Sequence, residues 1–293
     1  MAANAMRPFR YLTPRRLDEA LALLTPAAVP LAGGTDLFLR MERRQALPDT
    51  IMDLKRIPGL DEIAAAGDGL RIGALAVMET LAGAPAVVGD YDALAEAARV
   101  VGSIQTRNRA TVGGNLANAS PAADTATPLI ALGAAVEIAA AAGTREMPVE
   151  QLFQGPGRAA VGGDELLTAI HVPARPARSG SAFQRCVRTA MDIALVNCAA
   201  FVRLDEDDPD TVAEARIALG AVGPTPLRSA SAEQRLTGAR LDEHVVEEAG
   251  ECAASDARPI DDVRASADYR REMVRVLTRR AIRSAFRRAR GEA

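Results

Sequence analysis

Two short segments of this chain contain residue types that could do chemistry. Each has a pair of glycines close to a hydroxyl side chain. One is Thr111-Val-Gly-Gly-Asn115 and the other is Ala32-Gly-Gly-Thr-Asp36. Paired glycines allow backbone conformations that other residues avoid, and they leave no Cβ between the peptide and a ligand. Successive N–H groups can then bind phosphate oxygens. Two such segments predict a site for two linked phosphates.

Other phosphate-binding and catalytic patterns are absent or incomplete. A P-loop is excluded, because no Gly-Lys-Ser/Thr sequence occurs in the chain. The segment Gly155-Pro-Gly-Arg-Ala-Ala160 matches the dinucleotide pattern G-x-G-x-x-A. A Rossmann site also needs a preceding strand and a long following helix, which Gly162-Gly163 would interrupt. No pattern indicates a nucleophile or a general base, so no catalytic residue is predicted.

Composition limits the classes of protein and of site. The chain has 293 residues, enough for two domains or one large one, and its net charge of −3 predicts no general affinity for nucleic acid or anionic membranes. No apolar run is long enough to span a bilayer. Three scattered cysteines and two histidines predict neither a disulfide framework nor a metal site. The N-terminal residues lack the apolar region of a signal peptide, so a cytoplasmic location is expected.

Hydrophobic periodicity predicts the elements that position the glycine segments. Residues 9–54 alternate short strands with helices, and Gly33-Gly34 follows a brief strand. Residues 59–172 contain hairpins and helices, including a hairpin turn at Gly67-Asp68-Gly69 and a helix from Asp124 to about Leu132. A linker at Pro173–Ser181 precedes three antiparallel strands and then helices. The last helix is dense in arginine, which predicts a solvated basic face or a partner contact.

The combination of motifs resembles a known family. The two glycine segments, together with Ser120-Pro-Ala-Ala-Asp124, look like the FAD-binding subunit of the molybdenum hydroxylases, which include xanthine and carbon monoxide dehydrogenases. Asp192-Ile-Ala-Leu-Val196 and the segment from Asp261 to Arg270 resemble the C-terminal part of that subunit. The likeness covers nearly the whole chain.

This resemblance implies an α+β fold. Expected is a two-lobed FAD-binding fold of the PCMH or vanillyl-alcohol-oxidase type, followed by a C-terminal α/β domain with a three-stranded antiparallel sheet and helices. The expected units are residues 1–58 for the first lobe, 59–176 for the second lobe and 177–293 for the C-terminal domain.

The resemblance also implies which residues contact FAD. Both glycine segments would hold the diphosphate, and Asp36 would cap the next helix. Asp124 would bind ribityl or ribose hydroxyls, cap a helix, or do both. Leu166 and Leu167 would lie beside the flavin ring or belong to the core. Arg185, or its neighbour Gln184, would lie near the pyrimidine carbonyls, where a permanent positive charge favours reduced flavin. The expected cofactor-binding residues are Leu31, Ala32, Gly33, Gly34, Thr35, Asp36, Leu37, Val101, Ala110, Thr111, Gly113, Gly114, Asn115, Ala117, Ala123, Asp124, Leu166, Leu167 and Arg185.

The implied function is electron transfer by an FAD-carrying subunit of a molybdopterin-dependent hydroxylase or dehydrogenase. Its partners would be a molybdopterin-binding large subunit and a 2Fe-2S small subunit, in a heterotrimer or a dimer of heterotrimers. Electrons would pass from the 2Fe-2S clusters to FAD and then to NAD, a quinone or another acceptor. Two alternatives are a stand-alone flavin oxidase or reductase of the same fold, and a nucleotide-binding scaffold subunit that has lost FAD.

Overall fold

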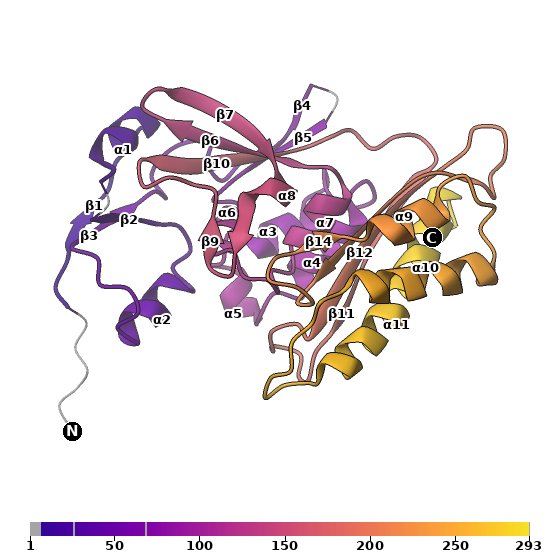
Figure 1. Ribbon diagram of the computed structural model, residues 1–293. Helices are drawn as coiled ribbons and strands as arrows, with labels where there is room; N and C mark the ends of the chain where they lie inside the picture. Colours follow the sequence, from indigo (N-terminus) through magenta and orange to yellow (C-terminus); the bar gives the residue numbers. More distant parts are fainter. Residues whose placement is uncertain (1–6, 26, 68, 293) are drawn as a thin grey trace.

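The structure, a computed structural model, describes residues 7–25, 27–67 and 69–292. A small N-terminal lobe lies at one end of the molecule and the C-terminal helices lie at the other, with a group of sheets and short helices between them (Figure 1). Within the described ranges, no helix combines the length and the apolar character needed to cross a membrane.

The first lobe is a small parallel sheet whose strands are joined by helices. The strands are β1 (Arg10–Leu12), β2 (Ala28–Leu31) and β3 (Thr50–Asp53), in the order β1-β3-β2, and the connecting helices are α1 (Leu17–Leu23) and α2 (Leu37–Glu42). Parallel strands require such crossover connections. Ile51 and Met52 are neighbours on β3 and pack into two different small cores, because successive strand residues point to opposite faces. The predicted alternation of strand and helix is confirmed.

The central sheet is antiparallel, with the strand order β4-β5-β10-β6-β7. Its strands are β4 (Ile63–Ala66), β5 (Gly69–Gly73), β6 (Ala135–Ala140), β7 (Gly143–Pro148) and β10 (Glu165–Val172). One face buries Ile72, Val136 and Ile170 in the largest core of the molecule. The β4–β5 hairpin that the sequence predicts is present, although Asp68, in its predicted turn, lies outside the described residues.

Short helices pack against the buried face of the central sheet (Figure 1). They are α3 (Met78–Gly83), α4 (Asp92–Arg99), α6 (Val112–Ala117), α7 (Ala126–Ala131) and α8 (Val149–Leu152), whereas α5 (Ile104–Arg107) has no buried residue. The segment with the dinucleotide-like pattern forms the small hairpin of β8 (Phe153–Gly155) and β9 (Arg158–Ala159). This segment therefore does not begin a long helix, which agrees with the expectation that its match to the dinucleotide pattern is a chance one.

The C-terminal region is an antiparallel sheet covered by three helices. The sheet contains β11 (Ser179–Cys186), β12 (Val196–Leu204), β13 (Val212–Gly220) and β14 (Leu227–Arg228), and the helices are α9 (Ala230–Leu236), α10 (Glu243–Asp256) and α11 (Ala267–Ala289). The three long strands match the predicted ones. The fourth, β14, has two residues, which is too short to leave a period in the sequence.

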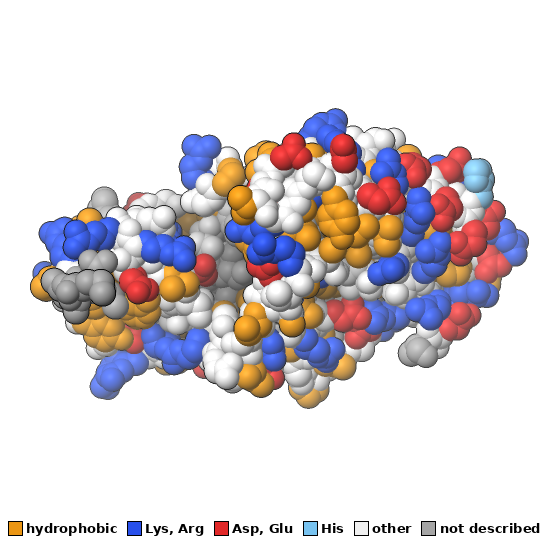
Figure 2. Space-filling model, turned by 90° about the horizontal axis from the view of Figure 1, so that it is seen from below, with side chains coloured by type: hydrophobic (Ala, Val, Ile, Leu, Met, Phe, Trp, Pro, Cys, Tyr) orange, Lys and Arg blue, Asp and Glu red, His pale blue; other side chains and the backbone are white. Residues whose placement is uncertain are grey.

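Three arginines of α11 form ion pairs with the neighbouring helix α10. Arg275, Arg279 and Arg283 contact glutamates of α10, at 2.5 to 2.7 Å for the shortest pair of each. Figure 2 shows positive and negative side chains intermingled over a broad area of the surface. The arginine-rich sequence thus belongs to a mixed-charge surface rather than to a uniformly basic face.

Candidate cofactor-binding site

The two glycine segments, which lie about 80 residues apart in sequence, touch each other in space. A Cβ placed on Gly33 would lie 2.0 Å from the carbonyl oxygen of Arg109 and 3.1 Å from the Cα of Ala110. A Cβ on Gly114 would lie 3.8 Å from the Cβ of Ala32. Only glycine permits this approach at position 33, so the sequence requirement there is steric.

The backbone conformation differs from the expectation at three of the four glycines. Gly34 has φ +79°, in the left-handed region that favours glycine, whereas Gly33, Gly113 and Gly114 do not have positive φ. Gly113 and Gly114 form the first turn of α6. A Cβ on Gly113 would lie 2.6 Å from the Cβ of Ala74, so this glycine permits close packing under the helix.

The N–H groups of the second segment already have acceptors within the chain. The N–H of Val112 donates to Ala76 and that of Gly113 donates to Ala74, at 3.0 and 2.9 Å. Thr111 is the N-cap of α6, and its Oγ1 accepts from the N–H of Gly114 at 3.1 Å. This segment therefore offers the Thr111 hydroxyl and a close-packed surface, not the row of free N–H groups that the glycine pair suggested.

The first segment, in contrast, has three consecutive N–H groups without an acceptor. No described residue accepts a hydrogen bond from the backbone N–H of Gly33, Gly34 or Thr35. All three residues are half-buried and lie between β2 and α2. Consecutive backbone N–H groups that have no partner within the protein and remain partly open to solvent can bind an anion, so this turn is suited to an anionic ligand.

A side-chain network that the sequence did not predict supports this turn. The ammonium group of Lys55, the only lysine in the chain, lies 3.3 Å from the carbonyl oxygen of Ala32 and 2.6 Å from Asp53 Oδ1. The hydroxyl of Tyr11 donates to Asp53 Oδ2 at 2.5 Å. Burial alone would raise the pKa of Asp53, but the hydrogen bonds from Lys55 and Tyr11 lower it. The negative charge of Asp53 thus holds Lys55 beside the glycine turn.

Asp124 forms a buried ion pair instead of capping α7. Helix α7 begins two residues later, with Thr125 as its N-cap. Asp124 Oδ2 lies 2.7 Å from Nη1 of Arg185, and Asp124 Oδ1 accepts from Asn197 at 3.2 Å. Burial raises the pKa of Asp124 to about 6, although Arg185 and Asn197 act to lower it. The sequence could not show this, since Arg185 is 61 residues away.

The strand register shows which residue of β11 contacts Asp124. Arg185 pairs with Asn197 on β12 and shares a face with it, whereas Gln184 pairs with Cys198, which belongs to the core beneath the C-terminal helices. Asn197 is fully buried and also accepts from the hydroxyl of Thr127 at 3.0 Å. Asn197 and Thr127 were not predicted; neither stands in a local motif.

Asn115 connects the two parts of the candidate site. Its Oδ1 accepts from the hydroxyl of Thr125 at 2.7 Å, which joins α6 to the residue after Asp124. A continuous set of contacts therefore runs from the glycine segments, through Asn115 and Thr125, to the Asp124–Arg185 pair.

The remaining predicted residues have mixed surroundings. Asp36 occupies the N-cap position of α2 as expected, but its exposed side chain makes no capping hydrogen bond. Leu166 is 3% exposed and packs with Met52 and Leu75, whereas Leu167 is half-buried against the largest core. The others are Leu31, Ala110 and Ala123, which are buried, Leu37 and Val101, which are half-buried, and Ala117, which is exposed.

A cavity of 230 Å³ lies away from these residues, between the central and C-terminal regions. Tyr91, Arg175, Phe201 and Arg216 are among its lining residues, and none of the predicted cofactor-binding residues is. It is smaller than the roughly 300–1,000 Å³ typical of sites for small molecules, so it does not rival the glycine segments as a dinucleotide site.

Two family models together match almost all of the chain. Residues 7–175 match the FAD binding domain in molybdopterin dehydrogenase, and residues 181–285 match the CO dehydrogenase flavoprotein C-terminal domain. The first match alone covers more than half of the 293 residues.

Curated relatives and solved structures agree with these matches. The chain is 35% identical to the xanthine dehydrogenase FAD-binding subunit of Escherichia coli O157:H7, over 94% of this chain and 95% of that protein. It is 34% identical to the carbon monoxide dehydrogenase medium chain of Hydrogenophaga pseudoflava, over 95% and 97%. A solved carbon monoxide dehydrogenase structure from Hydrogenophaga pseudoflava superposes with a TM-score of 0.92, at 34% identity, and covers 97% of this chain and 99% of the other. The chain therefore belongs to the FAD-binding subunits of the molybdopterin dehydrogenase family of oxidoreductases.

Proposed function

We propose that this chain is the electron-transfer subunit of a molybdenum-containing dehydrogenase, taking electrons from 2Fe-2S clusters and passing them to NAD, a quinone or another acceptor. Relatives of similar length are described as medium chains or FAD subunits of such enzymes, which supports this role. FAD, when bound, supplies the redox chemistry, because it accepts and donates electrons singly or in pairs. The protein supplies binding, orientation and electrostatics.

The observation that carries the proposal is the turn at residues 33–35. Its three N–H groups have no acceptor among the described residues, and the second glycine segment packs directly against it. We infer that these N–H groups and the hydroxyl of Thr111 bind the diphosphate of FAD. Lys55 donates a hydrogen bond to the carbonyl oxygen of Ala32, and it would therefore hold a positive charge beside this turn.

Asp124 and Arg185 are proposed to contact the flavin half of FAD. Their ion pair lies at the other end of the contacts that begin at the glycine segments. The guanidinium of Arg185 is permanently charged and would favour the electron-rich, reduced flavin. Burial raises the pKa of Asp124, and the ion pair with Arg185 partly offsets this rise.

The proposed partners are a molybdopterin-binding large subunit and a 2Fe-2S small subunit. We also propose that residues 1–58, 59–176 and 177–293 form the two FAD-binding lobes and the C-terminal domain, because each range contains one of the three larger sheets. A reducing cytoplasm is part of the proposal, and the three unpaired cysteines support it.

Co-purification from the native host tests this function. A tagged chain should carry about one FAD and should bring down molybdenum and iron in a complex whose flavin is reduced when substrate is added. A yellow preparation without either metal would favour the stand-alone oxidase or reductase. A preparation that stays colourless after FAD is added and the excess removed would favour the scaffold.

A further inference from the structure

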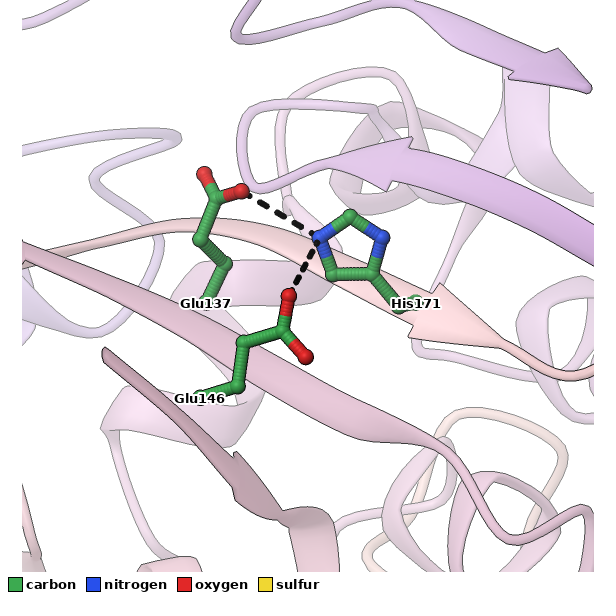
Figure 3. Close-up of side chains that lie close together, drawn as sticks. All are labelled: Glu137, Glu146 and His171. Carbon is green, nitrogen blue, oxygen red and sulfur yellow. Dashed lines mark hydrogen bonds and ion pairs between the residues drawn. The ribbon is translucent and has the colours of Figure 1, made fainter. Parts of the chain in front are cut away.

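Three side chains that no part of the proposed function uses converge on the open face of the central sheet. They are Glu137 of β6, Glu146 of β7 and His171 of β10 (Figure 3). Nε2 of His171 lies 3.2 Å from Glu137 Oε2 and 3.7 Å from Glu146 Oε1. All three atoms lie within 4.8 Å of one another, and the residues are half-buried or exposed, so ions from solvent can reach them.

The pleat of the sheet explains why these residues meet. Val136, Ile138 and Ile170 point into the large core, so their neighbours Glu137 and His171 point to the opposite face. Glu137 and Glu146 stand directly opposite each other on paired strands. Like charges in this position destabilise a sheet unless a positive charge lies between them.

The second oxygen of Glu137 is already held by other groups. Thr168 donates a hydrogen bond to Oε1 at 2.6 Å, and the guanidinium of Arg71 lies 3.8 Å from the same oxygen. These contacts leave Oε2 directed at His171. Partners that orient a carboxylate in this way are typical of metal-binding side chains.

We propose that Glu137, Glu146 and His171 bind a divalent metal ion, zinc above all, with water completing the coordination. Zinc binds imidazole nitrogen and carboxylate oxygen at about 2.0–2.2 Å, so two ligands of one ion lie at most about 4.2 Å apart. The two distances from His171 meet this limit, and the Glu137 and Glu146 oxygens lie within 4.8 Å of each other, a separation that rotation of the exposed Glu146 side chain can adjust. A divalent ion would supply one positive charge for each carboxylate and would join the β6–β7 hairpin to β10.

Zinc titration of the full-length, FAD-loaded chain tests the site. The accessible thiols of Cys186 and Cys252 are first alkylated, because cysteines also bind zinc, whereas Cys198 is fully buried. Isothermal titration calorimetry should then find one zinc ion per chain, and zinc at about 100 times its Kd should raise Tm by about 5 °C. His171→Gln should abolish this binding, and Glu146→Gln should weaken it at least about tenfold. The control is His244→Gln, since His244 is the other histidine and lies 3.3 Å from Glu248 on an exposed helix face.

The result that overturns the proposal is equally direct. Thiol-blocked wild-type protein that binds no zinc, or His171→Gln protein that binds it with wild-type affinity, would leave the cluster as a set of ion pairs. Circular dichroism and FAD content check that the variants fold. If His171→Gln does not fold, Glu146→Gln decides, because its side chain is 59% exposed and its replacement removes no buried contact.

Discussion

Replacing Gly33 by alanine should loosen the junction of the two glycine segments and weaken FAD binding. The added Cβ would lie 2.0 Å from the carbonyl oxygen and 2.7 Å from the carbonyl carbon of Arg109. Both atoms belong to the backbone, so no side chain can rotate away. The segments must move apart, which would separate the N–H groups of residues 33–35 from Thr111.

The size of the effect follows from the cost of overpacking. One methyl group forced into a close-packed contact costs about 1–3 kcal/mol. Since about 1.4 kcal/mol corresponds to tenfold in affinity, FAD should bind roughly 5- to 150-fold more weakly. Quenching of flavin fluorescence on titration of apoprotein measures this change. Gly83→Ala is the matched control, because no atom of the described residues lies within 4 Å of the added Cβ and the φ of Gly83 is not positive.

Two results would refute this reasoning. One is wild-type FAD affinity in Gly33→Ala, which would mean that the contact with Arg109 does not shape the site. The other is a fall in the Tm of the apoprotein so large that unfolded protein explains the whole loss of affinity. The substitution would then act on general stability and not on the site.

Three further predictions address the network around the site. Thr111→Val removes the N-cap of α6 and should lower stability by about 1 kcal/mol and weaken FAD binding, whereas Thr111→Ser should restore both in thermal melts and titrations. Lys55→Met removes the contact with Ala32 and should weaken FAD binding several-fold, with Lys55→Arg as the charge-preserving control; unchanged affinity in Lys55→Met would exclude a role for this charge. Burial raises the folded-state pKa of Asp124 from 3.8 to about 6, so the folded apoprotein holds this proton more tightly than the unfolded chain does. The stability that this proton contributes is complete below about pH 4 and is lost as the pH rises to about 6. Denaturant unfolding should show that the stability of wild type relative to Asp124→Asn falls as the pH rises from about 4 to about 6, and a difference that does not change with pH would contradict the assignment.

Local sequence was sufficient to predict the elements and the two glycine segments. The strand before Gly33, the double glycine and the residues after it form one continuous pattern, and the structure brings this segment against the second one as expected. The family resemblance supplied the fold, which periodicity alone would have left as an alternation of short strands and helices.

The contacts that fix the chemistry depend on distant residues, and the sequence did not show them. The N–H groups of Val112 and Gly113 are used by carbonyls of Ala76 and Ala74, more than 30 residues away, so the glycine pair gave a misleading picture of free donors. Asp124 was expected to bind ribityl or ribose hydroxyls, to cap the adjacent helix, or to do both, but a strand from the C-terminal region also brings Arg185 to it.

The cluster of Glu137, Glu146 and His171 illustrates the same limit. The small number of histidines and cysteines predicts no metal site, whereas the proposed site needs only one histidine with two glutamates. The cluster instead depends on the register of three adjacent strands, one of which follows the hairpin by more than 15 residues.

Hydrogen exchange of the backbone N–H groups of Gly33, Gly34 and Thr35 tests most directly the central claim that this turn binds the diphosphate of FAD. Apoprotein, protein with FAD and protein with riboflavin, which lacks both phosphates, should be compared by NMR. Exchange at these three positions should be slow with FAD and fast in the other two samples. Exchange that stays fast with FAD, or that riboflavin slows equally, would contradict it.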